Sequence, residues 1–102
     1  KLTGMTDVWV GSWMPAWPYM ADSKMRELAK KLYRERTGEE MRELAVHGGL
    51  ELGVFSEKMP GMDIVTLGCT SGDEHTVTEW MDIDSYARVY DFMKDFIAEL
   101  CK

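Results

Sequence analysis

The clearest pattern of apolar and polar positions lies near the end of the chain. Apolar residues recur there at steps of three and four, the period of one helical face: Ile83, Tyr86, Tyr90, Met93, Ile97 and Leu100. Val89 and Phe96 widen the same stripe. Asp82 can cap the start of such a helix, and Asp82 and Asp84 favour the positive end of its dipole. The pattern predicts a helix over residues 83–100.

An earlier segment has the same helical period. Its apolar positions are Met25, Leu28, Ala29, Leu32 and Tyr33. Asp22 or Ser23 supplies the N-cap, and Gly38 suits the position that follows a helix C-terminus near Arg36 or Thr37. A second helix is therefore predicted between these two ends.

Three shorter segments have the composition of β-strands, at residues 7–13, 41–46 and 63–67. The first is aromatic and β-branched, the second contains Arg42 and Glu43, and the third has the continuous apolar centre of a buried parallel strand. Gly48 and Gly49 follow the second segment, and residues 50–58 look helical. This part of the chain therefore predicts a strand, a tight turn and a helix.

The predicted order of elements is strand, helix, strand, helix, strand, helix. Such alternation favours parallel strands with helices packed on the sheet, so the predicted fold class is α/β, a small three-layer βαβαβα arrangement in one segment, 1–102. Pro60-Gly61 marks a turn before the third strand, and a polar loop at residues 68–81 follows that strand. Loops of this length are usually functional or disordered.

Composition and charge argue against several classes of function. The 102 residues carry a formal net charge of −6 and lack the basic stripe that nucleic acid requires. The charge also disfavours an anionic membrane surface, and no apolar run approaches the roughly 20 residues that span a bilayer. No signal peptide opens the chain, and Cys69 and Cys101 form neither a zinc knuckle nor a disulfide framework. These features predict a cytoplasmic protein.

Three motifs carry a resemblance to a known family. The first is Gly49-Leu50-Glu51-Leu52-Gly53, followed by Phe55-Ser56-Glu57-Lys58 and Pro60-Gly61-Met62-Asp63. The second is Gly68-Cys69-Thr70 before a loop that holds His75 and ends in Glu79, and the third is Pro15-Ala16-Trp17 before Ser23. In this order, residues 12–100 resemble the aminoacyl-histidine dipeptidases (Xaa-His dipeptidases, carnosinase-like) of the di-zinc exopeptidase superfamily. The family typically differs at four places, with glycine at Ala16, cysteine at Leu52, proline at Cys69 and Ser-Pro-Asp at Thr76-Val77-Thr78.

The resemblance implies that this segment is the C-terminal part of the catalytic domain of a zinc-dependent dipeptidase. Such enzymes hydrolyse dipeptides, often with a C-terminal histidine, at two zinc ions. The general base and the other metal ligands lie upstream in the family, so no catalytic residue is assigned here and only the last ligand maps onto this sequence, at His75. Because one histidine cannot hold zinc tightly, negligible zinc affinity and no activity are expected for the chain alone.

The residues of the loop also have simpler interpretations. Taken alone, His75 reads as a solvated loop histidine flanked by acids. A loop that follows a parallel strand is nevertheless a usual place for a ligand in α/β sheets. Glu79 could orient a metal-bound His75, or it could be an exposed loop acid.

The glycine turn offers a second candidate site. Glycines let a backbone approach a ligand closely, and N–H groups at a helix start favour anions. The resemblance suggests that Gly48, Gly49 and Leu50 contact the substrate carboxylate, although a plain tight connection explains the turn equally well. Glu51 could meet a substrate amino group or merely stabilise the first helical turn. His47 is interpreted as a strand-end residue.

Three functions stay open on the sequence. The first is the dipeptidase segment, with the remainder of a parent chain and a dipeptide as partners. The second is a non-catalytic binding or scaffold module derived from that fold, favoured by the departures at Leu52 and Thr76-Val77-Thr78. The third is an unrelated α/β domain whose glycine turn binds a phosphate or carboxylate. Because unpaired strands leave sheet edges open, self-association or a homodimer is also expected.

Overall fold

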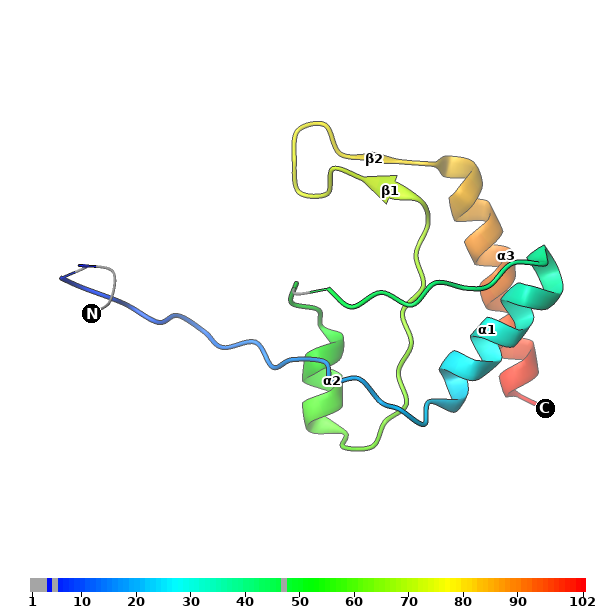
Figure 1. The fold of residues 1–102 in the computed structure, drawn as a ribbon, viewed down its shortest axis with the longest axis horizontal. Helices are drawn as coiled ribbons and strands as arrows, with labels where there is room; N and C mark the ends of the chain where they lie inside the picture. The colour runs from blue at the N-terminus through cyan, green and yellow to red at the C-terminus, as the bar shows by residue number, and fades with distance from the viewer. Residues whose placement is uncertain (1–3, 5, 47) are drawn as a thin grey trace. The chain divides into compact units, whose positions relative to one another are not determined.

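The computed structural model describes Gly4, residues 6–46 and residues 48–102. Its elements follow one another as α1 (Lys24–Thr37), α2 (Leu52–Lys58), β1 (Ser71–Gly72), β2 (Trp80–Met81) and α3 (Ile83–Leu100) (Figure 1). The chain divides into two compact units. Unit 1 comprises Lys1–Tyr19 and Val46–Met62, and unit 2 comprises Met20–Ala45 and Asp63–Lys102.

Helix α1 confirms the prediction for the first helical segment and resolves its cap. Ser23, not Asp22, is the N-cap, and its hydroxyl oxygen accepts a hydrogen bond from the Arg26 N–H at 2.9 Å. At the other end, Gly38 has φ 77° and donates its N–H to the Arg34 carbonyl at 2.8 Å. A left-handed residue after the last helical turn is the usual stop, and glycine adopts it without a Cβ clash.

Helix α3 has the predicted bounds, but only one of its two buried aromatic side chains, Phe96, belongs to the apolar stripe that predicted the helix. Asp82 caps the helix by accepting the Asp84 N–H at 2.9 Å. The side chains packed inside unit 2 are Phe92 and Phe96, while Ile97 of the stripe is 53% exposed. Four other members of the stripe are also exposed: Ile83, Tyr86, Tyr90 and Leu100. The helix is apolar around much of its circumference, and part of that apolar surface is exposed.

The core of unit 2 lies between α1 and α3. Ala29, Phe92 and Phe96 are buried, and the rings of Phe92 and Phe96 stack with centroids 6.4 Å apart. Tyr33 of α1 meets Phe92 edge-on, also at 6.4 Å. Offset and edge-on ring pairs are favourable arrangements for aromatic side chains. Seven partly buried side chains surround this cluster: Met25, Leu28, Leu32, Tyr33, Met41, Val65 and Leu67.

The three predicted strands have no regular secondary structure in the described part of the chain. Residues 7–13, 41–46 and 63–67 form no ladder, and the described sheet is the antiparallel pair β1–β2, with Ser71 opposite Met81 and Gly72 opposite Trp80. A strand exists only where a neighbouring strand accepts and donates its backbone hydrogen bonds. The three-layer parallel βαβαβα arrangement therefore stays a prediction.

Unit 1 contains α2 and the predicted turn that follows it. Helix α2 begins at Leu52, two residues later than the predicted start of the helical pattern. The turn at Pro60-Gly61 is confirmed, because the Met62 N–H bonds to the Met59 carbonyl at 3.0 Å and Gly61 has φ 84°. Proline followed by a positive-φ glycine is the signature of a type II turn.

Candidate functional site

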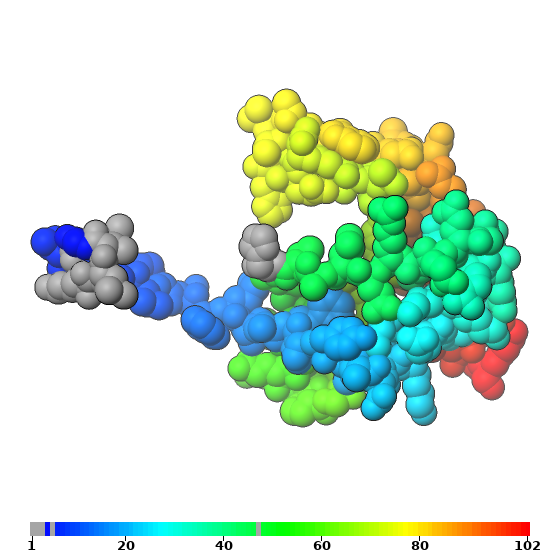
Figure 2. All heavy atoms as spheres, viewed as in Figure 1, coloured from blue at the N-terminus to red at the C-terminus, as the bar shows by residue number. Residues whose placement is uncertain are grey.

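The segment at residues 68–81, expected to be a polar loop that is either functional or disordered, contains a short β-hairpin. Strands β1 and β2 hold its two ends together, and the Trp80 indole lies so close to Gly72 that a Cβ there would come within 2.7 Å of the ring. A side chain at this position would force the indole of Trp80 to shift. The connection between the strands, residues 73–79, lies at the surface of unit 2, within the yellow atoms of Figure 2.

The hairpin is tied to the start of α3. The Asp82 N–H bonds to the Thr70 carbonyl at 2.8 Å, next to the β1–β2 pairing. The buried Ser85 hydroxyl accepts the Thr70 N–H at 2.8 Å and donates to the Asp82 carbonyl at 2.7 Å. Because a helix is rigid, these bonds give the base of the hairpin a fixed position relative to α3.

His75 lies at the exposed tip of the hairpin in an uncommon backbone conformation. Its φ is 65°, and that of Asp73 two residues earlier is 54°. The left-handed region costs a non-glycine residue roughly 1–2 kcal/mol, although Asp and His enter it more readily than most. Such a conformation persists only where surrounding interactions hold it.

Those interactions come from side chains of the same loop. The Thr76 hydroxyl donates to the Asp73 carbonyl at 2.7 Å, lies 3.0 Å from the Thr78 hydroxyl and accepts the Thr78 N–H at 3.2 Å. Glu79 accepts the backbone N–H of His75 at 3.3 Å. At the base of the loop, the Ser71 hydroxyl bonds to Glu74 at 2.6 Å and lowers the pKa of that carboxyl.

The sequence leaves two interpretations of Glu79, a group that orients the His75 imidazole or an exposed loop acid. Its recorded contact with His75 is the hydrogen bond from the backbone N–H. Both residues are exposed. The assignments of His75 as a metal ligand and of Glu79 as its orienting group stay predictions.

The donor set in the described residues fits one position of a zinc site, not a whole site. Nowhere in residues 6–46 and 48–102 do three or more His, Cys, Asp or Glu side chains form a group that could hold a metal ion. Structural and catalytic zinc sites use three or four protein ligands. The exposed imidazole of His75 is a donor of the right chemistry, and further ligands would have to come from other residues.

The glycine turn lies in unit 1, and its predicted contact residues are exposed. At Gly49 a Cβ would fall 2.6 Å from the Met14 sulfur, which belongs to a flexible side chain. Glu51 precedes α2 with a helical backbone and no side-chain capping bond, so its predicted interaction with the helix dipole stays a prediction. His47 lies outside the described residues. Since the turn and His75 belong to different units, a shared site stays a prediction.

Two of the family motifs meet inside unit 1, a contact that the sequence reasoning missed. Gly53 is buried in α2, and a Cβ there would lie 2.0 Å from the Pro15 carbonyl oxygen. That distance is far inside van der Waals contact, so only glycine lets the helix lie against Pro15-Ala16. The signal that could have revealed it is the glycine itself, since glycine in a helix interior is unfavourable without such a reason.

Two other motif residues form a polar cluster at the start of α1. Asp63 accepts the Ser23 hydroxyl at 2.6 Å and the Met25 N–H at 2.8 Å. Burial alone would raise the pKa of Asp63, but the hydrogen bonds from Met25, Ser23 and Lys24 and the nearby Arg26 together lower it. The cluster supplies partners to the helix N-terminus, which explains both residues structurally.

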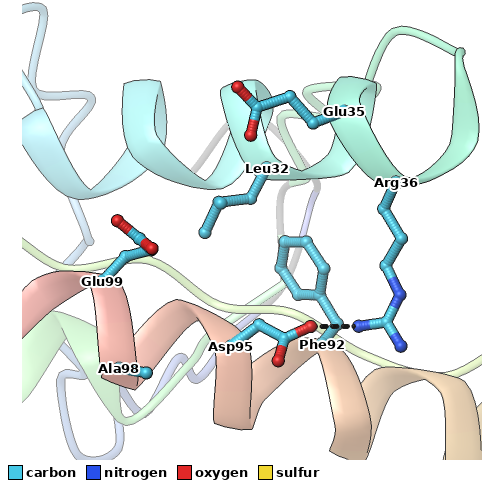
Figure 3. A pocket seen from close by; sticks show the side chains of 7 residues that line it. All are labelled: Leu32, Glu35, Arg36, Phe92, Asp95, Ala98 and Glu99. Atoms are coloured by element: carbon cyan, nitrogen blue, oxygen red, sulfur yellow. Dashed lines mark hydrogen bonds and ion pairs between the residues drawn. The ribbon is translucent and has the colours of Figure 1, made fainter.

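A hollow between α1 and α3 contains none of the predicted site residues (Figure 3). Its apolar side chains include Leu32 and Phe92, and Arg36 bonds to Asp95 across it at 2.8 Å. The remaining lining residues are Glu35, Ala98 and Glu99. The carboxylates here are surface groups of two helices, and the hollow lies on the packed side of α3.

The sequence is similar to known proteins along almost its whole length. A family profile described as peptidase family M20/M25/M40 matches residues 7–99. The cytosol non-specific dipeptidase of Escherichia coli (strain K12) is 27% identical over 100 residues, which are 98% of this chain and 20% of that protein. The chain thus spans about a fifth of the length of this curated relative. No solved structure matches it significantly, and no described helix is long and apolar enough to cross a membrane.

Proposed function

Because the chain belongs to peptidase family M20/M25/M40, we propose that it is the C-terminal part of the catalytic domain of a zinc-dependent dipeptidase. The family match over residues 7–99 carries this proposal. A dipeptidase that aligns with 98% of the chain supports it. The relative is named as a cytosolic protein, which supports the proposal of a cytoplasmic location.

In this proposal His75 supplies one zinc ligand and the remainder of the parent chain supplies the others. When bound, a pair of zinc ions would activate a water molecule and polarise the scissile carbonyl. The exposed tip of the hairpin suits a ligand that completes a site from outside this chain. Gly48, Gly49 and Leu50 would bind the substrate carboxylate through their N–H groups, with Glu51 near the substrate amino group.

The proposed substrates are aminoacyl-histidine dipeptides. This part of the proposal comes from the motifs that contain Gly49-Leu50-Glu51 and His75. The matched relative is named as non-specific, so substrate range is the least constrained part of the function. A panel of dipeptides that differ only in the C-terminal residue tests it directly.

The deciding experiment uses the full-length parent protein. Zinc content and hydrolysis of β-alanyl-histidine, alanyl-histidine and alanyl-alanine are measured for the parent and for its His75→Ala variant. We expect about two zinc ions per chain in the parent. The variant should lose zinc and at least about 100-fold in hydrolysis, because a ligand is removed from the metal centre. A variant that keeps both zinc and hydrolysis would refute the role of His75, and a parent without hydrolysis would refute the enzyme.

The alternative is a non-catalytic module that keeps the fold. It is favoured by Leu52 and by Thr76-Val77-Thr78, which depart from the resembled family in both candidate loops. The parent reading frame separates the two functions. His-x-Asp and Glu-Glu motifs upstream of this segment would support the enzyme, and their absence would support the module.

Self-association of the isolated chain is a further part of the proposal. The first predicted strand exposes aromatic side chains, with Trp9 and Trp13 each 87% exposed. Monomers with large exposed apolar surfaces tend to associate. Light scattering should report a dimer or larger species at high concentration, and a clean monomer would contradict this expectation.

A further inference from the structure

His75 and Asp73, two residues apart, both have positive φ in a loop that contains no glycine between its strands. A loop of this kind keeps its shape only if side chains hold the backbone. The hydrogen bonds of residues 73–79 converge on one of them. Thr76 bonds through its hydroxyl to the carbonyl of Asp73 on one side and to Thr78 on the other.

The backbone of Thr76 also forms hydrogen bonds that hold the loop together. Its N–H donates to the Asp73 carbonyl at 3.1 Å, and its carbonyl accepts the Glu79 N–H at 3.3 Å. The Asp73 carboxylate lies 3.5 Å from the Thr78 hydroxyl, and the Glu79 carboxylate accepts the His75 N–H. His75 thus lies within the bridged segment Asp73–Thr76, and a second bridged segment, Thr76–Glu79, follows it directly.

We propose that Thr76 is a positioning residue for His75: its hydroxyl closes the loop and holds His75 in the left-handed conformation. This conformation fixes the direction in which the Cα–Cβ bond leaves the hairpin, and therefore the region of space that the imidazole can reach. The base of the hairpin is itself bonded to α3 through Thr70, Ser85 and Asp82. The base of the loop that carries the imidazole consequently has a fixed position relative to a rigid helix, although His75 itself is exposed.

The effect of Thr76 on the conformation of His75 does not depend on the proposed function. The inference rests on the proposed function only where it states that the loop presents His75 as a metal ligand. A histidine that serves as a ligand must reach the metal in one orientation, and groups that hold a ligand typically affect affinity by about 10–100-fold. Val77, which lies between the two threonines, is fully exposed and contributes no packing to the arrangement.

The conformational test uses the 102-residue chain labelled with ¹⁵N. A residue with positive φ gives a strong cross-peak between its own Hα and HN, because the two hydrogens lie close together. We expect this signal at His75 in the unmodified chain and in Thr76→Ser, which keeps the hydroxyl. In Thr76→Val the signal should fall to that of ordinary residues. The His75 amide should then exchange with solvent about tenfold faster, as expected when an ordinary hydrogen bond is lost.

Thr66→Val is the matched control, since it removes a hydroxyl from an exposed threonine outside the loop. It should leave the His75 signals unchanged. The proposal is overturned if the unmodified chain lacks the strong cross-peak, if Thr76→Val keeps it, or if Thr76→Ser behaves like Thr76→Val. Unchanged amide shifts in α3 confirm in each case that the variant has folded.

The second test measures zinc affinity in the full-length parent. Thr76→Val should lower it about 10–100-fold, and Thr76→Ser should restore it. If His75→Ala binds zinc as tightly as the parent does, the proposed function is wrong, whatever the loop conformation. If His75→Ala loses zinc and Thr76→Val does not weaken it, the ligand assignment stands and the positioning role of Thr76 is wrong.

Discussion

The start of α1 and the tip of the β1–β2 hairpin are built from the same kinds of side chain, but they use them in different surroundings. At α1, the Asp63 carboxylate accepts a hydroxyl and a backbone N–H beside Ser23, which is only 2% exposed. At the hairpin, the Glu79 carboxylate accepts a backbone N–H at the exposed residue His75.

This difference separates motif residues that serve the fold from those that do not. Ser23, Asp63 and Gly53 are explained by a helix cap and a close backbone contact. His75 is exposed, and its backbone conformation costs free energy. A residue that the fold does not need, held in an unfavourable conformation, is the better candidate for chemistry.

The largest effect on the free energy of unfolding is expected for a substitution in the core between α1 and α3. Phe96→Ala removes the most completely buried large side chain, so it should lower the free energy of unfolding by about 3–5 kcal/mol. Ile97→Ala, on the exposed side of the same helix, should cost less than about 1 kcal/mol. Urea denaturation followed by circular dichroism measures both, and equal losses would show that α3 buries a different face.

A smaller effect is expected when one carboxylate from each region, Asp63 at the start of α1 and Asp73 in the hairpin loop, is neutralised. Asp63→Asn should lower the free energy of unfolding by about 1–3 kcal/mol, because partly buried donors at the start of α1 lose a charged acceptor. Asp73→Asn, in the exposed loop, should change it by no more than about 0.5 kcal/mol, since asparagine also tolerates positive φ. The same urea titrations measure both variants, and a larger loss for Asp73→Asn would reverse the comparison.

The pH dependence follows from the lowered pKa of Asp63. A carboxyl whose pKa is lower in the folded than in the unfolded state stabilises the fold above its unfolded pKa of about 3.9, and this contribution is lost as pH falls through the folded pKa. Urea titrations between pH 7 and pH 3 should therefore show a steeper loss for the unmodified chain than for Asp63→Asn. Parallel curves would mean that the folded environment does not lower the pKa of Asp63.

The hairpin side is tested by two substitutions at one position. At φ 65° an alanine keeps the Cβ penalty and a glycine does not, so His75→Gly should be more stable than His75→Ala by about 1 kcal/mol. This order is the reverse of that at an ordinary exposed site, where the flexibility of glycine in the unfolded chain is unfavourable. Thermal unfolding of the two variants gives the answer, and a more stable alanine variant would show that His75 is not left-handed.

The smallest effect is expected at the ion pair that joins the two long helices. A guanidinium nitrogen of Arg36 and a carboxylate oxygen of Asp95 lie 2.8 Å apart, but both side chains are well exposed to solvent. A double-mutant cycle with Arg36→Ala and Asp95→Ala should give a coupling of about 0.2–1 kcal/mol that falls with added salt. A coupling above about 2 kcal/mol would show that this contact is far more protected from water than its exposure indicates.

Much of the local structure followed from the sequence alone. The bounds of α3, the stop of α1 at Gly38 and the turn at Pro60-Gly61 were all predictable. Each depends on residues within about four positions of one another, through helical period, capping groups or the allowed φ of proline and glycine. The broader peptidase family also followed from short motifs, whereas the aminoacyl-histidine specificity stays a prediction.

Tertiary structure decided what depends on distant partners. Asp63 lies 40 residues after Ser23, and no residue adjacent to Asp63 in the sequence predicts that it accepts hydrogen bonds at the start of α1. Which face of α3 is buried depends on where α1 lies, because the helix offers apolar side chains on more than one side. The same holds for residues 7–13, whose composition suits a strand. Composition sets the preference for a strand, but only a neighbouring strand can supply the hydrogen bonds that make one.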